Sequence, residues 1–387
     1  MKILWSANAP WCPSGYGAET ALFATRLRDL GHEIYIAANF GLNGAGSVWN
    51  GIPVLPAAFD GTGCDVIGAH VQSLKPDLVI ILADAWPLSA QALKALPCPV
   101  GVWMPVDCGR ADGEPPDAPR LGSADAAMLR ESGVVPIAMS RYGERALREA
   151  GFDPLYVPHA ADLRVFRPPA DREALRAKWG VTGKFVIGIN GANKDGIRKS
   201  YAEQFLAFAR FRKSRPEALL LVHAFARQPG SIDLTVLARR VGIADAVLFS
   251  DEYKYIEGML SPVDLADWYG VLDAYSGCSY GEGFGVPLIE AAACGTPVIT
   301  TSASAMTELK GPGWAVSGEP FYNAKHDAWW LKPGVKAIAA AYEKAFKLAA
   351  PKRAAAREFA LGYDADLVLL DHFKPALDAL MERGKPA

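Results

Sequence analysis

The 387-residue chain is poor in cysteine, has no long apolar run and carries little net charge. Each of these features argues against a particular class of protein. Its six cysteines are scattered, with no Cys-x-x-Cys pair and no histidine cluster nearby, which argues against a structural zinc site and a disulfide framework. No run reaches the roughly 18 apolar residues that a membrane-spanning helix needs. The opening "MKILWSANAPW" meets Asn and Pro too early for a signal peptide. We therefore expect a protein of a reducing, cytoplasmic compartment.

The formal net charge of −2 gives no overall attraction for nucleic acid or an anionic membrane. The charge is unevenly distributed, however. Residues 1–166 contain 12 Lys and Arg against 17 Asp and Glu, a balance of −5, and the remainder contains 28 against 25, a balance of +3. The mildly basic second half hints at an anion-binding site there.

The length suits two domains, and the hydrophobic pattern predicts an α/β fold. Apolar runs of strand length, such as "KILWSA", "PDLVIILA" and "CPVGVWMPV", alternate with helical segments such as "GAETALFATRLRDLG". A second series of this kind starts at "KFVIGING", after the paired prolines Pro168 and Pro169. We predict two Rossmann-like domains, 1–168 and 169–350, followed by helices over 351–387 that pack back on the N-terminal domain.

The densest motif is "SYGEGFGVPLIEAAACGTPVITT", residues 279–301, in which Glu282 and Glu290 stand eight positions apart. Gly283 and Gly285 allow close approach of the backbone, and Pro287 suits the first turn of a helix whose free N–H groups can hold an anion. Two carboxylates here can each accept hydrogen bonds from a pair of sugar hydroxyls. The alternative is that the glutamates merely complement the helix dipole.

This motif closely resembles the signature of retaining glycosyltransferases of the GT-B fold, family four, which carry two glutamates separated by seven residues. Further segments resemble the same family. They are "SGYGAET", its N-terminal glycine-rich loop; "YVPHAADLRVFRP", its linker; "GINGANKDGIRKSYAEQFLAFARF", its basic donor segment; and "SPVDLADWYGVLDAYSGCS", which leads into the glutamates. The resemblance implies two Rossmann-like domains that face each other across a cleft, with the acceptor on the N-terminal side and the nucleotide-sugar donor on the C-terminal side.

The resemblance also implies roles for residues of the donor side. Glu282 would lie beside the donor sugar and Glu290 would bind the ribose. Arg198 and Lys199 would neutralise the donor diphosphate in a metal-free site. The usual Gly-Arg before the lysine is replaced by "GANKDGIRKS", so Lys194 competes with Arg198 for this role, and a solvated basic turn is the alternative reading.

The N-terminal side offers a glycine pair and several candidates for the acceptor. Gly15 and Gly17 open the first predicted helix, where their amides would face the donor diphosphate across the cleft. The pair also resembles the start of a dinucleotide fingerprint, but Thr20 stands in place of the third glycine and the second strand ends without an acidic residue, which excludes a dehydrogenase. Asp107 follows a predicted buried strand and would orient the acceptor hydroxyl, or else it only caps the turn. Asp84 and Trp86 follow another strand end. His159 reads as a structural linker residue.

The resemblance thus implies a metal-independent, retaining hexosyltransferase that moves a sugar from a nucleotide diphosphate, UDP by default, to a glycan, lipid-linked or small-molecule hydroxyl. No cofactor or metal is expected, because no Asp-x-Asp follows a strand. One alternative is a phage-type enzyme that glycosylates a modified DNA base, with a basic rim at Arg141, Arg145 and Arg148, although the −5 balance opposes binding of duplex DNA. Another is an inactive nucleotide-sugar-binding homologue.

The candidate residues fall into three groups. The catalytic candidates are Glu282, Asp107, Arg198 and Lys199; the donor-binding candidates are Gly15, Tyr16, Gly17, Arg198, Lys199, Ser250, Tyr253, Glu282, Gly283, Phe284, Gly285, Val286 and Glu290; and the acceptor-binding candidates are Asp84, Trp86 and Asp107.

Overall fold

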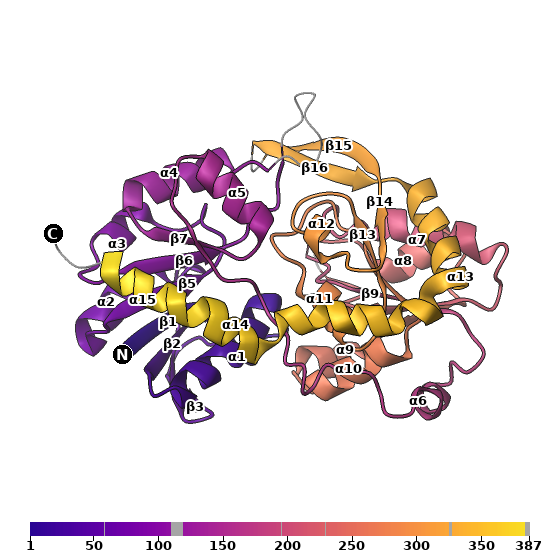
Figure 1. Cartoon of the computed structure of the whole chain (residues 1–387), viewed down its shortest axis with the longest axis horizontal. Helices are drawn as coiled ribbons and strands as arrows, with labels where there is room; N and C mark the ends of the chain where they lie inside the picture. The colour runs from indigo at the N-terminus through magenta and orange to yellow at the C-terminus, as the bar shows by residue number, and fades with distance from the viewer. Residues whose placement is uncertain (58, 110–118, 195, 229, 325–326, 384–387) are drawn as a thin grey trace.

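The structure, a computed structural model, consists of two helix-covered sheets that lie side by side (Figure 1). It describes residues 1–57, 59–109, 119–194, 196–228, 230–324 and 327–383. The first sheet has the strand order β3-β4-β2-β1-β5-β6-β7-β8 and the second the order β11-β10-β9-β12-β13-β14. All neighbouring strands run parallel except β3 and β4.

The N-terminal domain alternates strands and helices as the sequence predicts. Its strands are β1 Lys2–Asn8, β2 Glu33–Phe40, β3 Ser47–Trp49, β4 Ile52–Leu55, β5 Leu78–Leu82, β6 Val100–Met104, β7 Val135–Ala138 and β8 Leu155–Tyr156. Its helices are α1 Gly15–Asp29, α2 Cys64–Leu74, α3 Ala90–Lys94, α4 Ser123–Ser132 and α5 Arg141–Glu149. Every residue of β5 and β6 is buried, because helices cover both faces of a parallel sheet.

The C-terminal domain repeats the pattern. Its strands are β9 Val186–Asn190, β10 Leu219–His223, β11 Val247–Phe249, β12 Ala274–Gly277, β13 Val298–Thr301 and β14 Trp314–Val316. Its helices are α6 Arg172–Lys178, α7 Tyr201–Arg212, α8 Leu234–Arg240, α9 Glu252–Ile256, α10 Pro262–Val271, α11 Val286–Ala293 and α12 Met306–Leu309. The α/β fold with two Rossmann-like domains is therefore confirmed.

After β14 the chain forms an antiparallel hairpin and then a helical tail. The hairpin consists of β15 Gly318–Asn323 and β16 Ala328–Pro333; the tail consists of α13 Val335–Ala360, the 3-10 turn η1 Leu361–Tyr363, α14 Ala365–Val368, the π-helical η2 Leu369–Phe373 and α15 Lys374–Arg383. The predicted division at 350 falls inside α13, which continues through Pro351. The hairpin had no counterpart in the predicted elements.

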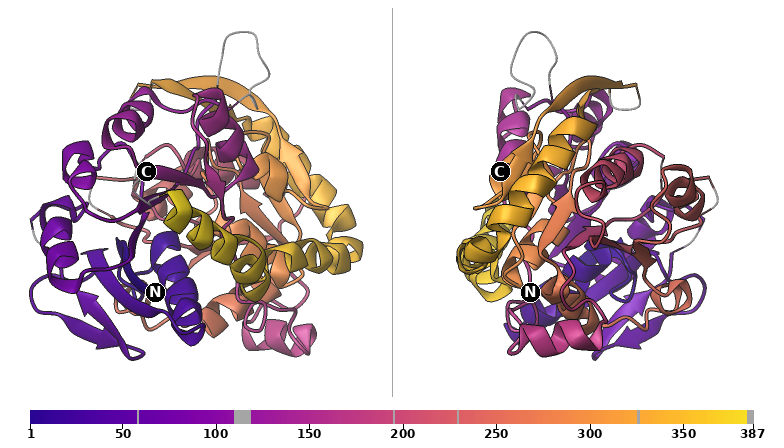
Figure 2. Two further views of the ribbon diagram at one scale, coloured as in Figure 1. Left: turned by 60° about the vertical axis from the view of Figure 1, so that its left-hand side comes forward. Right: turned by 90° about the vertical axis from the view of Figure 1, so that its right-hand side faces the viewer.

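The tail returns to the N-terminal sheet, as Figures 1 and 2 show in yellow. Phe373 packs with ring centroids 5.7 Å from Trp5, 4.9 Å from Phe23 and 5.4 Å from Trp103. All four rings are buried, so α13 and the tail join the two domains through one apolar core. None of the described helices is both long and apolar enough to cross a membrane.

Candidate active site

Glu282 lies in the turn between β12 and α11 and binds two cations from the segment that follows β9. Arg198 Nη1 is 2.9 Å from Glu282 Oε2, and Lys199 Nζ is 2.5 Å from Oε1. The Glu282 amide donates to Ser304 Oγ at 3.0 Å. Burial opposes ionisation of this carboxyl, but the charges of Lys199 and Arg198 outweigh burial and lower its pKa to about 2. The structure thus brings three of the four predicted catalytic residues together.

Two glycines beside Glu282 allow this turn to touch the N-terminal domain. A Cβ at Gly281 would lie 2.3 Å from the Asp107 carbonyl oxygen, and a Cβ at Gly283 would lie 2.0 Å from Pro105 Cβ. The lack of a side chain at Gly283 makes room for the loop after β6. That the Gly283 backbone lies near the hydroxyls of a donor sugar stays a prediction. Pro105 of the N-terminal domain thereby contacts the turn that carries Glu282.

Helix α11 begins after Gly285, whose φ of +115° lies in a region that other residues rarely adopt. Its Val286 is buried at the first helical position, and Gly295 follows the helix end with a φ of +75°. Phe284 is also buried, with its ring 5.4 Å from that of His159 and 5.8 Å from that of Tyr363. The Phe284 side chain therefore fixes the turn between the domains.

Glu290 is buried in α11 and accepts a hydrogen bond from a tyrosine. Tyr269 donates to Glu290 Oε2 at 2.8 Å and accepts from Asn190 Nδ2 at 2.7 Å. Burial, with a smaller contribution from the charge of Glu19, raises the pKa of Glu290 to about 7 although the Tyr269 hydrogen bond opposes the shift. Glu290 lies beyond the first turn of α11, where the effect of the helix dipole has fallen off, so the dipole alone does not account for a carboxyl at this position.

Tyr16 reaches between the two domains from the first turn of α1. Burial raises its pKa well above the usual value; Asp84, Asp107 and Glu282 add to the shift and Arg198 opposes it. These four charged groups belong to both domains, so the phenol lies where the predicted donor and acceptor sites meet.

The glycines beside Tyr16 differ in their surroundings. The amide of Gly17 donates to Ser14 Oγ at 3.1 Å, and a Cβ there would lie 2.4 Å from the Cys12 carbonyl oxygen. The predicted contact of the Gly17 amide with a diphosphate is therefore wrong: this amide caps α1, and the glycine is needed for close packing. Gly15 is exposed at the start of α1.

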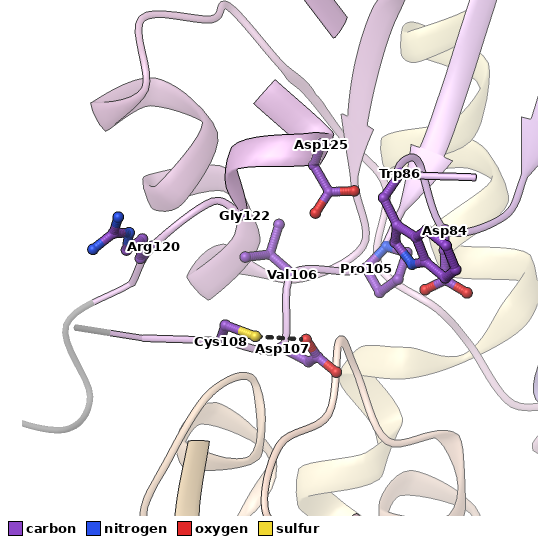
Figure 3. A pocket seen from close by; sticks show the side chains of 9 residues that line it. All are labelled: Asp84, Trp86, Pro105, Val106, Asp107, Cys108, Arg120, Gly122 and Asp125. Atoms are coloured by element: carbon purple, nitrogen blue, oxygen red, sulfur yellow. Dashed lines mark hydrogen bonds between the residues drawn. The ribbon is translucent and has the colours of Figure 1, made fainter. Parts of the chain in front are cut away.

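The predicted acceptor residues line one pocket of the N-terminal domain (Figure 3). Asp84 and Trp86 follow β5, and Asp107 follows β6, so the carboxyl ends of neighbouring parallel strands bring them together. Asp107 Oδ1 accepts from the Cys108 thiol at 3.2 Å. The remaining lining residues are Pro105, Val106, Arg120, Gly122 and Asp125.

Asp125 is a pocket residue that the sequence analysis missed. It lies in the first turn of α4, is only 8% exposed, and has a pKa raised to about 7 by burial and by the charges of Asp84 and Asp107. An acidic residue in a first helical turn is common on any protein surface, so no sequence signal distinguished it.

Residues 205–345 match the model of a family described as glycosyl transferases group 1. The chain carries a glycosyl transferases group 1 domain. A D-inositol 3-phosphate glycosyltransferase of Rhodococcus jostii is 30% identical over 209 residues, 51% of this chain and 43% of that protein. The lipopolysaccharide core mannosyltransferase LpsB of Rhizobium meliloti is 29% identical over 41% of this chain and 44% of its own. The match thus spans less than half of these relatives.

Solved glycosyltransferases share the fold over almost the whole chain. A sucrose-phosphate synthase of Thermosynechococcus elongatus superposes with a TM-score of 0.74 at 15% identity, covering 99% of this chain and all of that one. Anabaena HepE in complex with UDP and glucose superposes with a TM-score of 0.68 at 18% identity, covering 98% of this chain and all of that one. At such identities the likeness shows the fold alone, and that fold is GT-B.

In this glycosyl transferases group 1 domain, the residues predicted to contact the donor base are only partly brought inward. Ser250 Oγ lies 2.8 Å from His223 Nδ1, whereas Tyr253 is 67% exposed on α9. Tyr255 of the same helix instead packs on the rings of His223 and Phe225, at 5.1 and 5.2 Å. Of these two tyrosines of α9, Tyr255 is therefore the one whose ring packs inward.

Two alternatives about cations can now be compared. Lys194 lies over the Phe40 ring, 5.5 Å from its centroid, whereas Arg198 binds Glu282. Of these two candidates, Arg198 is the one that contacts Glu282, beside Lys199; the pairing of Arg198 with a diphosphate stays a prediction. Of the predicted basic rim, Arg141 and Arg148 both bind Glu144, at 2.7 and 3.0 Å, and Arg145 lies over the Tyr142 ring. This partial neutralisation weakens the argument for a duplex-binding surface.

His159 belongs to a buried pair in the interdomain linker. Its Nδ1 lies 3.3 Å from Glu19 Oε2, its ring centroid is 4.5 Å from that of Trp103, and both members of the pair are almost fully buried. The reading of His159 as a structural linker residue remains a prediction; the partner Glu19 was not foreseen.

Proposed function

We propose that the protein is a retaining glycosyltransferase that moves a hexose from a nucleotide diphosphate sugar, a UDP-sugar first of all, to an acceptor hydroxyl. The observation that carries the proposal is the convergence of Arg198 and Lys199 on Glu282, next to Tyr16 and the pocket of Asp107. Two adjacent cations suit a diphosphate, whose leaving charge needs fixed positive partners.

On the donor side, the diphosphate would bind Arg198 and Lys199 in place of Glu282. The released Glu282 carboxylate would then accept hydrogen bonds from the sugar hydroxyls. Glu290 would accept hydrogen bonds from the ribose hydroxyls through Oε1, since Tyr269 donates to Oε2. The relation to Anabaena HepE, solved with UDP and glucose, supports uracil as the base to test first.

On the acceptor side, Asp107 would orient the attacking hydroxyl and Trp86, 37% exposed, would offer a flat surface to a sugar ring. Attack on the face that the nucleotide leaves would retain the anomeric configuration, with the leaving phosphate taking the hydroxyl proton. The protein would then contribute position and charge, and exclusion of water would limit donor hydrolysis. We expect turnover without added metal, unchanged by a chelator, in the cytoplasm where nucleotide sugars are made.

The test is a thermal-shift panel with UDP, GDP, ADP, TDP and their common sugars. A ligand at about 100 times its Kd adds roughly 2.7 kcal/mol of stability, so one nucleotide should stand out. Glu282→Gln should retain nucleotide binding and lower turnover by about 100-fold or more, as loss of a transition-state contact does. The absence of a shift with every nucleotide would favour the inactive homologue, and wild-type turnover in Glu282→Gln would contradict the role of this carboxylate.

A further inference from the structure

The β15–β16 hairpin extends from the C-terminal domain toward the N-terminal domain, as the top of Figure 1 shows. Trp329 of β16 forms two backbone hydrogen bonds with Gly109, N–H to O at 2.8 and 3.1 Å. Two residues later the Leu331 amide donates to the Tyr280 carbonyl at 3.1 Å. One strand therefore joins the loop of Asp107 to the residue two positions before Glu282.

The Trp330 side chain fills the space between these two attachments. A Cβ on Gly281 would lie 2.7 Å from Trp330 Cδ1 and 2.3 Å from the Asp107 carbonyl oxygen. Gly281 therefore lies between the indole and residues 105–109, the loop after β6 that carries Asp107 and is called the acceptor loop below. The indole also lies near the Cys108 thiol, where it opposes the rise that burial and the neighbouring Asp107 carboxylate cause in the pKa of that thiol. Trp330 thus lies against Gly281, which precedes Glu282, and near Cys108, which follows Asp107.

The adjacent tryptophan points the other way, because successive side chains of a strand alternate between its faces. Trp329 packs on Tyr322 with ring centroids 5.3 Å apart, and Tyr322 is 48% exposed. The hairpin therefore contains an internal control: of two tryptophans in one strand, Trp330 places its side chain against Gly281, whereas Trp329 bonds Gly109 through its backbone and places its side chain against Tyr322.

We infer that Trp330 is a positioning residue for the acceptor, which holds the Pro105–Gly109 loop and its Asp107 against the Glu282 turn. The inference rests on the proposed function. The donor groups have other supports: Glu290 is held by Tyr269, and the carbonyl of Arg198 accepts from the Tyr280 amide at 2.8 Å. Loss of the indole should therefore affect use of the acceptor more than binding of the nucleotide.

The same bonds break and form in both cases, whether a sugar hydroxyl or water receives the glycosyl group. The bond between the anomeric carbon and the phosphate oxygen breaks, a bond to the incoming oxygen forms, and the incoming proton passes to the leaving phosphate. A mobile Asp107 would orient an acceptor hydroxyl less well, while water needs no such orientation. The ratio of transfer to hydrolysis consequently reports the role of Trp330.

The experiment compares Trp330→Ala and Trp330→Phe with Trp329→Ala. Three quantities are measured: the Kd of UDP by calorimetry, amide hydrogen exchange of residues 106–109 without ligand, and transfer from UDP-glucose to p-nitrophenyl glucoside against hydrolysis. For Trp330→Ala we expect exchange about ten-fold faster, a transfer-to-hydrolysis ratio about ten-fold lower and a Kd within about two-fold of wild type. Trp329→Ala should resemble wild type in all three.

Equal effects in both alanine variants, or a parallel loss of UDP affinity, would overturn the inference and leave Trp330 a packing residue. If Trp330→Ala fails to fold, Trp330→Phe takes its place, because it keeps an aromatic ring but lacks the Cδ1 and Nε1 edge that faces Gly281. Wild-type exchange and a wild-type transfer ratio in that variant would overturn the inference. A wild-type chain that binds no nucleotide would refute the proposed function instead. Exchange of residues 106–109 would still show whether the indole holds the loop, and unchanged exchange would refute that contact.

Discussion

Glu290 is the carboxyl whose protonation should be visible in the stability of the protein. Its pKa of about 7 in the fold lies above its ordinary value of 4.5 because burial favours the neutral form. The folded state therefore holds more protons than the unfolded state between about pH 4.5 and pH 7, so this residue's contribution to stability falls as the pH rises through that window. Glu290→Gln removes this titration and keeps an oxygen that can accept from Tyr269. We expect the variant to gain on the order of 2–3 kcal/mol relative to wild type between pH 5 and pH 8.

Thermal and chemical denaturation at the two pH values measure this difference directly. Glu131→Gln, at an exposed position on α4, serves as the control and should change little relative to wild type. A stability difference between wild type and Glu290→Gln that stays constant with pH would show that the buried carboxyl does not titrate in this window.

The turn between β12 and α11 depends on Gly283 for its contact with the other domain. An alanine there would place its Cβ 2.0 Å from Pro105 Cβ and 2.7 Å from Pro105 Cα, so the turn and the acceptor loop would have to separate. We expect Gly283→Ala to cost about 1–3 kcal/mol of stability, as overpacking usually does, and to lower transfer by about ten-fold or more. Gly68→Ala in α2, where a Cβ meets nothing within 4 Å, is the matched control and should not destabilise. Wild-type stability and transfer in Gly283→Ala would show that the two segments separate without cost.

The elements that the sequence predicted are those that local pattern determines. Buried strands such as β5 and β6 read as continuous apolar runs, and α11 is marked by Pro287 and Gly295 at its ends. The gathering of Glu282 with Arg198 was inferred from a family resemblance, because no pattern joins residues 84 positions apart. Asp125 and the contact of Gly283 with Pro105 escaped for the same reason: each depends on a partner in a distant segment or domain. The amide of Gly17 was misjudged because Ser14, three residues before it, takes its hydrogen bond.

The two domains are held together by contacts that a change of their relative position would break. Glu308 of α12 accepts hydrogen bonds from the amides of Arg141 and Tyr142, at 3.1 and 3.0 Å, at the start of α5 in the other domain. The Tyr255 hydroxyl lies 3.5 Å from the carbonyl oxygen of Pro13, and Gly109 pairs with Trp329. Of these contacts only Glu308 brings a carboxylate to a helix N-terminus, where the helix dipole favours negative charge. We therefore expect Glu308 to stabilise the present arrangement of the domains most strongly.

Removal of this carboxylate should shift the molecule toward a more open arrangement. Two hydrogen bonds to a charged acceptor are worth about 3–6 kcal/mol together, and a shift of that size changes the ratio of closed to open molecules by roughly 150-fold or more. Glu308→Ala should consequently have a larger radius of gyration in solution scattering without ligand than wild type, and addition of UDP-glucose should reduce the difference, because a donor that contacts both domains restores the closed form. Glu131→Ala should scatter like wild type. Identical scattering of Glu308→Ala and wild type, with and without donor, would mean that the other contacts between the domains, the tail helices and the hairpin among them, fix the domains without Glu308.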